Sequence, residues 1–358
     1  MQFDLMGVVF FVTGFAEVAR LGDKPYLYTP FVHQHLIEEF TVKKSRKKTS
    51  GKSLRGRDFL SIDDLSPNEI MSIFHLAADI KAHRRKYRRV LEDRMMALIF
   101  EKPSLRTRTT FAVGIQQLGG DSLFLSPAEI SLGKRESVYD VAKNLERMVD
   151  GIMVRTFGHD ICVSLADHAS IPVINGLTDL EHPCQAMADF FTLIETRKKL
   201  KKSKLSYIGD GNNVAHSLML TAAKLGSTFF VATPEHYAPN GEIVKRAHEL
   251  AAKSGASIVI TTDPIEAARD ADMIYTDTWA SMGQEAEAEK RRAVFAPYQV
   301  NRQLFSHAKK DAVFMHCLPA HRGEEVTDEI IDSGNSVVFQ EAENRLHVQK
   351  AIMFSLLR

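Results

Sequence analysis

The second half of the sequence alternates between short apolar runs and longer segments in which apolar residues recur at helical spacing. The apolar runs predict strands over 205–209, 228–232, 257–261, 273–277 and 312–317, and the spacing between them predicts helices over 214–225 and 241–252. Repeated strand–helix alternation is typical of a parallel sheet with helices on both faces. Ligands of such sheets bind beyond the carboxyl ends of the strands, so the candidate binding residues are those that follow each predicted strand.

The first half, from Asp58 onward, has the same organisation. Apolar runs predict strands over 95–100, 151–155 and 171–175, and apolar spacing predicts helices over 68–82 and 109–118. Ser66-Pro67 marks the start of the first helix, and Gly119-Gly120 marks the end of the second. Because 358 residues correspond to about two domains at roughly 150 residues each, we expect an α/β fold of two domains, each a parallel sheet with helices on both faces.

Charge and composition exclude several classes of protein. The chain carries 46 Lys and Arg against 45 Asp and Glu, so it lacks the positive field of a dedicated nucleic-acid binder. Its apolar run near the N-terminus, from Leu5 to Ala16, is shorter than the roughly 20 residues that span a membrane. Three cysteines cannot form a disulfide framework, which favours a cytoplasmic protein. We therefore expect neither a nucleic-acid partner nor a membrane partner.

Residues 1–52 differ from the rest of the chain. The stretch over 43–57 carries only basic charges, which is more typical of a solvated linker than of a targeting or polyanion-binding arm. Gly51-Lys52-Ser53 has the ending of a phosphate-binding loop, but Arg46 stands where the first glycine of that motif belongs. We expect residues 1–52 to be a flexible N-terminal extension and the chain to fold without them.

The segment after the strand over 95–100 combines hydroxyls and arginines at the start of a helix. Ser104, Arg106 and Thr107 lie in one turn, and Arg108 follows directly. Backbone N–H groups at a helix N-terminus bind anions, and cationic side chains beside them favour phosphate. A capped helix with surface arginines is the alternative, but the crowding of these groups into a single turn favours a phosphate site.

Two further groups follow strands of the first half. Arg155 ends the strand over 151–155, and His182-Pro183-Cys184-Gln185 follows the next strand, with Pro183 suited to a first helical turn. His182 and Gln185 can hydrogen-bond a carbonyl or an amide of a small ligand. A single histidine is more often structural, so this interpretation depends on the groups around it.

Two polar segments follow strands of the second half. Gly209-Asp210-Gly211-Asn212-Asn213 opens a helix as a dinucleotide fingerprint does, but Val214 occupies the position of the third glycine. We therefore expect the asparagines to recognise a small polar group. The segment over 277–283 contains the single tryptophan and offers the Asp277 carboxylate to an ammonium group.

His316, Cys317 and His321 follow the last predicted strand and suggest a metal site at first sight. Zinc sites need further ligands at fixed spacing, and neither a second cysteine pair nor a His-Glu-x-x-His motif accompanies these residues. We therefore expect no metal and no cofactor.

Four of these motifs, in this order, resemble the ornithine carbamoyltransferase family of the aspartate/ornithine carbamoyltransferase superfamily. They are Ser-x-Arg-Thr-Arg from Ser104, His-Pro-Cys-Gln from His182, Asp-x-Trp-x-Ser-Met-Gly from Asp277 and His-Cys-Leu-Pro from His316. The first two mark carbamoyltransferases in general, and the last two narrow the second substrate to ornithine. The resemblance runs from about Leu54 to the C-terminus.

The resemblance implies transfer of the carbamoyl group from carbamoyl phosphate to the δ-amine of L-ornithine, which gives L-citrulline and phosphate. By motif position, the residues implied at carbamoyl phosphate are Ser104, Leu105, Arg106, Thr107, Ser131, Arg155, His182, Gln185, Cys317, Leu318 and Arg345. The residues implied at ornithine are Asn213, Asp277, Ser281 and Met282. The catalytic roles fall to Arg106, which stabilises developing charge, and to a thiolate or carboxylate from Cys317 and Asp277, which orients the amine or accepts its proton.

The resemblance also implies an organisation for the whole chain. Residues 53–185 would bind carbamoyl phosphate, residues 186–340 would bind ornithine, and residues 341–358 would form a C-terminal helix that packs back on the first domain. The expected assembly is a homotrimer, or an assembly of trimers, with sites at subunit boundaries.

Two positions depart from the family pattern. Leu105 replaces the usual Thr, which removes a hydroxyl but keeps the backbone N–H, and Ser131 stands where relatives have His or Gln.

The open alternatives for the function are a carbamoyltransferase for putrescine, an acylated ornithine or aspartate, a nucleotide-binding dehydrogenase, and a non-catalytic relative. Both directions of flux, arginine biosynthesis and citrulline breakdown through the arginine deiminase pathway, fit the sequence.

Overall fold

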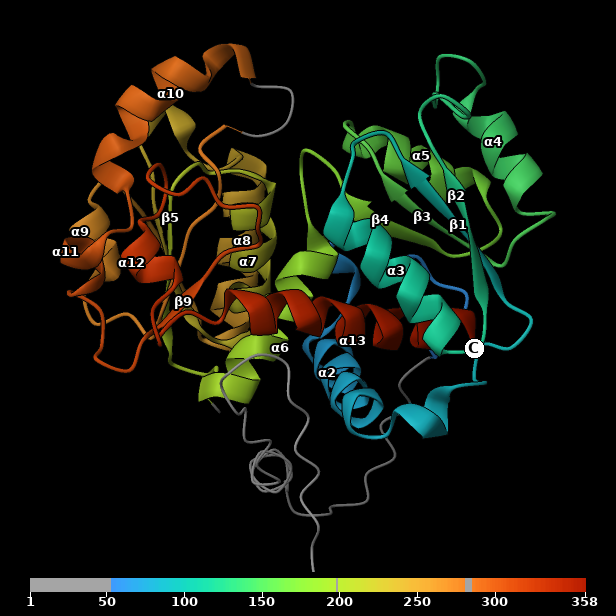
Figure 1. Ribbon diagram of the computed structural model, residues 1–358, viewed down its shortest axis with the longest axis horizontal. Coiled ribbons are helices and arrows are strands. Elements are labelled where there is room, and N and C mark those ends of the chain that lie inside the picture. Colours follow the sequence, from blue (N-terminus) through green and yellow to red (C-terminus); the bar gives the residue numbers. More distant parts are fainter. Residues whose placement is uncertain (1–52, 198, 281–284) are drawn as a thin grey trace, which may run out of the picture. The chain divides into compact units, whose positions relative to one another are not determined.

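The computed structural model describes residues 53–197, 199–280 and 285–358 (Figure 1). The predicted N-terminal extension, residues 1–52, lies outside the described residues, as do the predicted ornithine contacts Ser281 and Met282. In the part of the chain that is described, no helix is both long and apolar enough to cross a membrane.

Strands and helices alternate along both halves of the described chain. The strands are β1 (Met95–Phe100), β2 (Asp121–Leu125), β3 (Gly151–Arg155), β4 (Val173–Leu177), β5 (Lys204–Ile208), β6 (Thr228–Ala232), β7 (Ser257–Thr261), β8 (Met273–Tyr275) and β9 (Val313–Met315). The α-helices are α2 (Pro67–Ala82), α3 (Leu105–Gln117), α4 (Val138–Leu145), α5 (His159–His168), α6 (Pro183–Arg197), α7 (Asn213–Leu225), α8 (Gly241–Ser254), α9 (Pro264–Ala268), α10 (Ala288–Phe295), α11 (Arg302–Phe305), α12 (Asp328–Ile331) and α13 (Val338–Leu357).

The strands form two sheets in which every pairing is parallel. One sheet has the order β2-β1-β3-β4, and the other has the order β7-β6-β5-β8-β9. Helices flank both sheets, which confirms the predicted fold class (Figure 1). Each sheet has its own apolar core, with Ile99 and Ile152 in the first and Ile274 and Phe314 in the second.

The strand order determines which predicted groups become neighbours. In a parallel sheet, the carboxyl ends of adjacent strands meet at one edge. The segments after β1, β3 and β4 therefore meet at one edge of the first sheet, and those after β5, β8 and β9 meet at one edge of the second. These segments contain the four motifs, and Arg155 is the last residue of β3 at the same edge of the first sheet.

Some elements differ from the prediction at their ends. Helix α3 begins at Leu105, earlier than the predicted 109, because the Ser104 hydroxyl caps it by accepting the Thr107 N–H at 3.2 Å. Strand β2 was not predicted, since it lies at a sheet edge and its exposed residues break the apolar run. Strands β8 and β9 are shorter than predicted because the chain leaves the sheet before Asp277 and Cys317.

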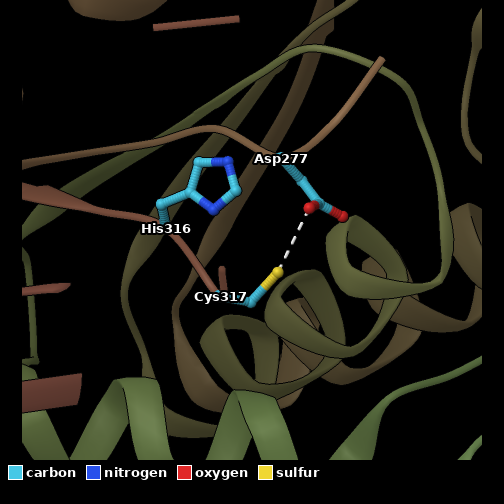
Figure 2. Close-up of side chains that lie close together, drawn as sticks. All are labelled: Asp277, His316 and Cys317. Carbon is cyan, nitrogen blue, oxygen red and sulfur yellow. Dashed lines mark hydrogen bonds between the residues drawn. The ribbon is translucent and has the colours of Figure 1, made fainter. Parts of the chain in front are cut away.

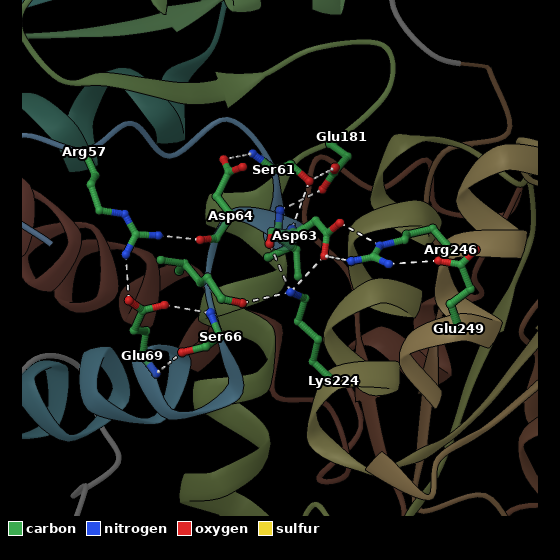
Figure 3. A network of polar contacts seen from close by, with 12 residues as sticks. Arg57, Ser61, Asp63, Asp64, Ser66, Glu69, Glu181, Lys224, Arg246 and Glu249 are labelled. Atoms are coloured by element: carbon green, nitrogen blue, oxygen red, sulfur yellow. Dashed lines mark hydrogen bonds and ion pairs between the residues drawn. The ribbon is translucent and has the colours of Figure 1, made fainter. Parts of the chain in front are cut away.

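A polar network ties the segment around Ser61 to helices α7 and α8 (Figure 3). The Asp63 carboxylate accepts a hydrogen bond from Arg246 Nε at 2.7 Å and lies 2.9 Å from Lys224 Nζ. The Ser61 hydroxyl donates to the carboxylate of Glu181, which directly precedes the His182 motif. The network thus connects Ser61 to the start of helix α6, where the predicted site residues His182 and Gln185 lie.

Candidate active site

Four basic side chains lie close together where α3, β3, α6 and α13 meet. They are Arg106, Arg155, His182 and Arg345. Arg155 ends β3 and is 6% exposed, and Arg345 on α13 is 3% exposed. Arg345 Nη2 donates to the Thr107 hydroxyl at 2.7 Å, which connects the last helix to the first turn of α3. Arg106 lies in that same turn. The structure therefore brings together four positively charged or basic side chains that the sequence places far apart.

The electrostatics of this cluster favour an anion. Burial and the charge of Arg345 together lower the pKa of Arg155 to about 10. Burial and the charges of Arg345, Arg155 and Arg106 hold the pKa of His182 well below its usual value, so its imidazole is neutral. Like charges in a buried place repel one another unless an anion compensates them. The cluster is thus suited to bind a phosphate-bearing ligand.

Gln185 lies next to this cluster, on the first turn of α6. Its Nε2 donates to Asp189 Oδ1 at 2.8 Å and to Glu341 Oε1 at 3.0 Å, and its Oε1 is buried without a hydrogen-bond partner among the described residues. Two nitrogens of the arginine cluster, Arg155 Nε and Arg345 Nε, are also buried without one. Unsatisfied buried polar atoms are rare and often mark a ligand site.

Asp277 and Cys317 face each other at the ends of β8 and β9 (Figure 2). The Cys317 thiol donates to Asp277 Oδ1 at 3.1 Å, and Asn212 Nδ2 donates to Asp277 Oδ2 at 2.8 Å. Burial raises the pKa of the Cys317 thiol well above its usual value, and the Asp277 carboxylate raises it further. Cys317 is therefore a protonated thiol here and not the thiolate that a proton-accepting role would require.

His316 supports the loop that follows β9. Its Nδ1 accepts the backbone N–H of Leu318 at 2.9 Å, which leaves the proton on Nε2, and Nε2 lies 3.2 Å from Glu325 Oε1. Asp277, His316 and Cys317 offer ligand atoms within 4.8 Å of one another, as a metal site would require. Both ring nitrogens of His316 are already used, however, so this histidine holds the backbone of Leu318 instead.

The predicted residues Leu105, Ser131 and Asn213 differ in their exposure and in their hydrogen-bond partners. Asn213 Nδ2 donates to the Thr178 carbonyl at 2.6 Å, so it contacts the loop after β4. Leu105 is 77% exposed at the start of α3. The Ser131 hydroxyl donates to the Pro127 carbonyl within its own loop, and none of its described contacts reaches the arginine cluster.

The partners of several supporting residues could not be recognised in the sequence. Asp210 pairs with the buried Arg291 at 2.9 Å, and Arg291 Nη1 also donates to the Trp279 carbonyl at 2.9 Å, which anchors the segment after Asp277. Asn212 caps α7 and holds Asp277 at once. The cap was recognisable because Asn212 is a polar residue before a helix. Its hydrogen bond to Asp277 was not recognisable, because 65 residues separate the two.

The glycines of the fingerprint-like motif have packing reasons. A Cβ on Gly211 would lie 2.3 Å from the backbone nitrogen of Pro239, and Gly209 has φ of +147°. These glycines therefore permit close backbone packing and an unusual backbone conformation. Together with Val214 at the third glycine position, this counts against the dehydrogenase alternative.

Glu181 gives a pH-dependent test of the support beneath His182. Glu181 accepts hydrogen bonds from the Ile62 N–H at 3.2 Å and the Ser217 hydroxyl at 3.0 Å, and the same hydroxyl accepts the His182 N–H at 2.9 Å. Burial raises the pKa of Glu181 from 4.5 to about 7. The folded state thus favours the neutral acid, and its stabilisation is complete below the unfolded pKa and is lost as the pH rises through 7.

We expect Glu181→Gln to remove this dependence. A raised pKa of this size corresponds to about 2–3 kcal/mol of unfolding free energy lost between pH 5 and pH 8 in the wild type. Chemical denaturation at a series of pH values measures the difference between the wild type and the variant. A variant whose stability falls with pH as steeply as that of the wild type would show that Glu181 is not the titrating group.

The fold and the site define a class of protein before any comparison. Buried cations lie at the strand ends of one sheet, and a carboxylate and a thiol lie at the strand ends of the other. Glu341 connects the two groups because it accepts hydrogen bonds from Gln185 and from the His316 N–H. This is a two-substrate α/β enzyme that can hold an anionic reactant beside an amine.

Comparison with known proteins identifies the family. Residues 57–195 match the carbamoyl-P binding domain of aspartate/ornithine carbamoyltransferases, and residues 201–356 match the Asp/Orn binding domain. The chain belongs to the aspartate/ornithine carbamoyltransferase family, as the four motifs predicted.

Individual relatives agree with this result. Ornithine carbamoyltransferase of Thermococcus kodakarensis is 54% identical over 303 residues, which cover 84% of this chain and 96% of the relative. The anabolic ornithine carbamoyltransferase of Pyrococcus furiosus is 52% identical over 303 residues, with 84% and 96% covered. A solved structure of ornithine carbamoyltransferase from Pyrococcus furiosus superimposes with a TM-score of 0.83 at 51% identity and covers 85% of this chain and 98% of that one.

Proposed function

We propose that this protein transfers the carbamoyl group of carbamoyl phosphate to the δ-amine of L-ornithine and releases L-citrulline and phosphate. The observation that carries the proposal is the position of Cys317. Its thiol donates to Asp277 at 3.1 Å, and the N–H of the preceding residue, His316, donates to Glu341, which also accepts a hydrogen bond from Gln185 beside the arginine cluster. A site for an anion and a site for an ammonium group therefore adjoin, as transfer between two bound reactants requires.

The first half of the proposed site holds carbamoyl phosphate. The phosphate lies against the start of α3, where Ser104, Arg106 and Thr107 provide hydroxyls and a guanidinium and Leu105 provides a backbone N–H. Arg155, neutral His182 and Gln185 contact the carbamoyl group, and Arg345 approaches from α13. Cationic groups placed in this way stabilise the charge that develops on phosphate as the C–O bond breaks.

The second half of the proposed site holds ornithine. Asp277 pairs with the α-ammonium group, and Asn213 and the segment with Ser281 and Met282 bind the α-carboxylate. The δ-ammonium group first loses one proton to solvent, and the free amine then attacks the carbamoyl carbon. The C–O bond to phosphate breaks as the C–N bond forms, and the leaving phosphate takes up the second proton of the attacking nitrogen. Because the Cys317 thiol is protonated, we assign it and the backbone of Leu318 to orienting the reacting groups rather than to deprotonating the amine.

The organisation implied by the family completes the proposal. We assign carbamoyl phosphate binding to residues 53–185, ornithine binding to residues 186–340, and a connecting helix to residues 341–358. The proposed assembly is a homotrimer in the cytoplasm, with the loop around Ser131 reaching the site of a neighbouring subunit. The 52% identity to an anabolic relative favours the biosynthetic direction, in which citrulline leads to arginine.

A product assay with three amines tests the proposal. The purified chain is incubated with carbamoyl phosphate and either L-ornithine, putrescine or L-aspartate, and the ureido product and phosphate are measured together. We expect turnover with ornithine and kcat/KM at least about a hundredfold lower with the other two amines. Preferred turnover of putrescine or aspartate would establish a different carbamoyltransferase, and no ureido product with any amine would indicate a non-catalytic relative.

A further inference from the structure

Two buried carboxyls control the orientation of the Gln185 amide. Asp189 and Glu341 accept hydrogen bonds from the same Nε2, at 2.8 and 3.0 Å. An amide nitrogen carries two hydrogens, so both are used by these contacts. The opposite atom, Oε1, is buried and has no partner among the described residues. The amide thus offers the site an acceptor and no donor.

Glu341 also contacts the strand ends of the other half of the site. The Tyr275 hydroxyl donates to Glu341 Oε1 at 3.1 Å, and the backbone N–H of His316 donates to Glu341 Oε2 at 3.0 Å. Tyr275 lies two residues before Asp277, and His316 lies directly before Cys317. One carboxyl group on α13 therefore holds the Gln185 amide and the ends of both β8 and β9.

The charge state of the pair is consistent with this role. Burial raises the pKa of Asp189 to about 7. Burial and the neighbouring Asp189 carboxyl raise the pKa of Glu341 well above its usual value. Two carboxyls that share one donor in a buried place retain a proton between them. The pair can thus keep accepting from Gln185 without two unpaired negative charges near the substrate.

We propose that Glu341 is a positioning residue which, together with Asp189, turns the Gln185 amide oxygen toward the NH₂ of the carbamoyl group. The inference rests on the proposed function and adds a determinant of specificity to it. An NH₂ group donates hydrogen bonds, whereas the methyl group of an acetyl phosphate does not. An acceptor fixed in place therefore selects a carbamoyl over an acetyl group of the same shape.

Glu341→Gln tests this inference because it keeps the shape of the side chain and changes its hydrogen-bonding pattern. In one orientation the new NH₂ faces the His316 N–H, and in the other it faces Gln185 Nε2, although the Tyr275 hydroxyl can rotate to accept from it. Two hydrogen-bond donors then face each other. The Gln185 amide therefore loses a hydrogen bond or flips, so that its Oε1 and Nε2 exchange places. The readout is the ratio of inhibition constants for phosphonoacetamide and acetonylphosphonate, stable analogues that carry NH₂ and CH₃ at the same position.

We expect the wild type to bind the NH₂ analogue at least about tenfold more tightly, and Glu341→Gln to reduce this preference to within about twofold. Asp189→Asn keeps an oxygen acceptor toward Gln185 and should retain the preference. Glu343→Gln is the matched control on the same helix, since Glu343 is 56% exposed and pairs with Lys81 and His347. If Glu341→Gln does not fold, Glu341→Met removes the acceptors without adding a donor and gives the same readout.

The outcomes separate the inference from the proposed function. A folded Glu341→Gln variant that keeps the wild-type preference, or that loses affinity for both analogues equally, overturns the positioning role, because a merely structural residue would not change the ratio. A wild type that binds both analogues without preference also overturns it. A wild type that binds neither analogue contradicts the proposed function instead.

Discussion

Replacing Arg106 with alanine is expected to lower kcat/KM for carbamoyl phosphate by about a thousandfold while the protein remains folded. In the proposed mechanism, this guanidinium contacts the phosphate at the start of α3, and its charge stabilises the leaving group as the C–O bond breaks. Removal of one such preorganised donor costs about 10²–10³ in rate, and a bidentate charged contact lies at the upper end of that range. Steady-state kinetics of citrulline formation measures the loss.

Arg108 provides the matched control for this variant. It lies on the same helix, is exposed, and places its guanidinium carbon 3.6 Å from the centroid of the Phe124 ring. The sequence groups Arg108 with the cations of the phosphate site, but its described contact is with Phe124. Arg108→Ala should therefore change kcat/KM by less than about fivefold, since the lost contact is worth about 0.5–1 kcal/mol. If Arg106→Ala retains wild-type kcat/KM, Arg106 does not contact the phosphate and the assignment of the α3 turn is wrong.

The second large effect is expected from Asp277→Asn. Loss of one partner of a desolvated charge pair costs about 2–5 kcal/mol, so kcat/KM for ornithine should fall by about 30-fold to 5,000-fold. The affinity for phosphonoacetamide should change by less than about threefold, since the arginine cluster is left intact. Both parameters are measured on one preparation, by citrulline formation and by inhibitor titration.

A purely structural role for Asp277 makes a different prediction. Asp277 Oδ1 accepts the Thr278 N–H at 2.8 Å, and an asparagine can keep this contact, so a capping role would cost about 1 kcal/mol of stability at most. Wild-type ornithine turnover together with a slightly lowered melting temperature would support that role. Asp263→Asn, at the exposed cap of α9, shows how large such a capping effect is in this protein.

Buried parallel strands explain why much of the fold was predictable. Both faces of such strands are covered, so the chain shows unbroken apolar runs. The predictions for 95–100, 151–155, 228–232 and 257–261 match β1, β3, β6 and β7 residue for residue. The motifs were recognisable for a related reason, because polar residues directly after an apolar run stand out in the sequence.

Residue patterns alone could not predict the contacts between these motifs, and it was only the family resemblance that placed Thr107 and Arg345 at the same ligand. Gln185 and Glu341 are separated by 156 residues, and Arg345 and Thr107 by 238. No periodicity or local motif connects such pairs, since α13 brings them together only in the folded chain. The protonation state of Cys317 was beyond reach for the same reason: burial and Asp277 determine it, and neither can be read from neighbouring residues.

The central claim is that the arginine cluster and Asp277 belong to one site that holds two reactants together. The most direct test is the affinity for a bisubstrate analogue in which phosphonoacetate is joined by an amide bond to the δ-nitrogen of L-ornithine. Titration calorimetry compares it with phosphonoacetamide and with ornithine separately. We predict one binding site per chain and an affinity at least about a thousandfold higher than that for phosphonoacetamide, because the two halves no longer bind independently. An affinity no higher than that for phosphonoacetamide would show that the two groups do not form a single site.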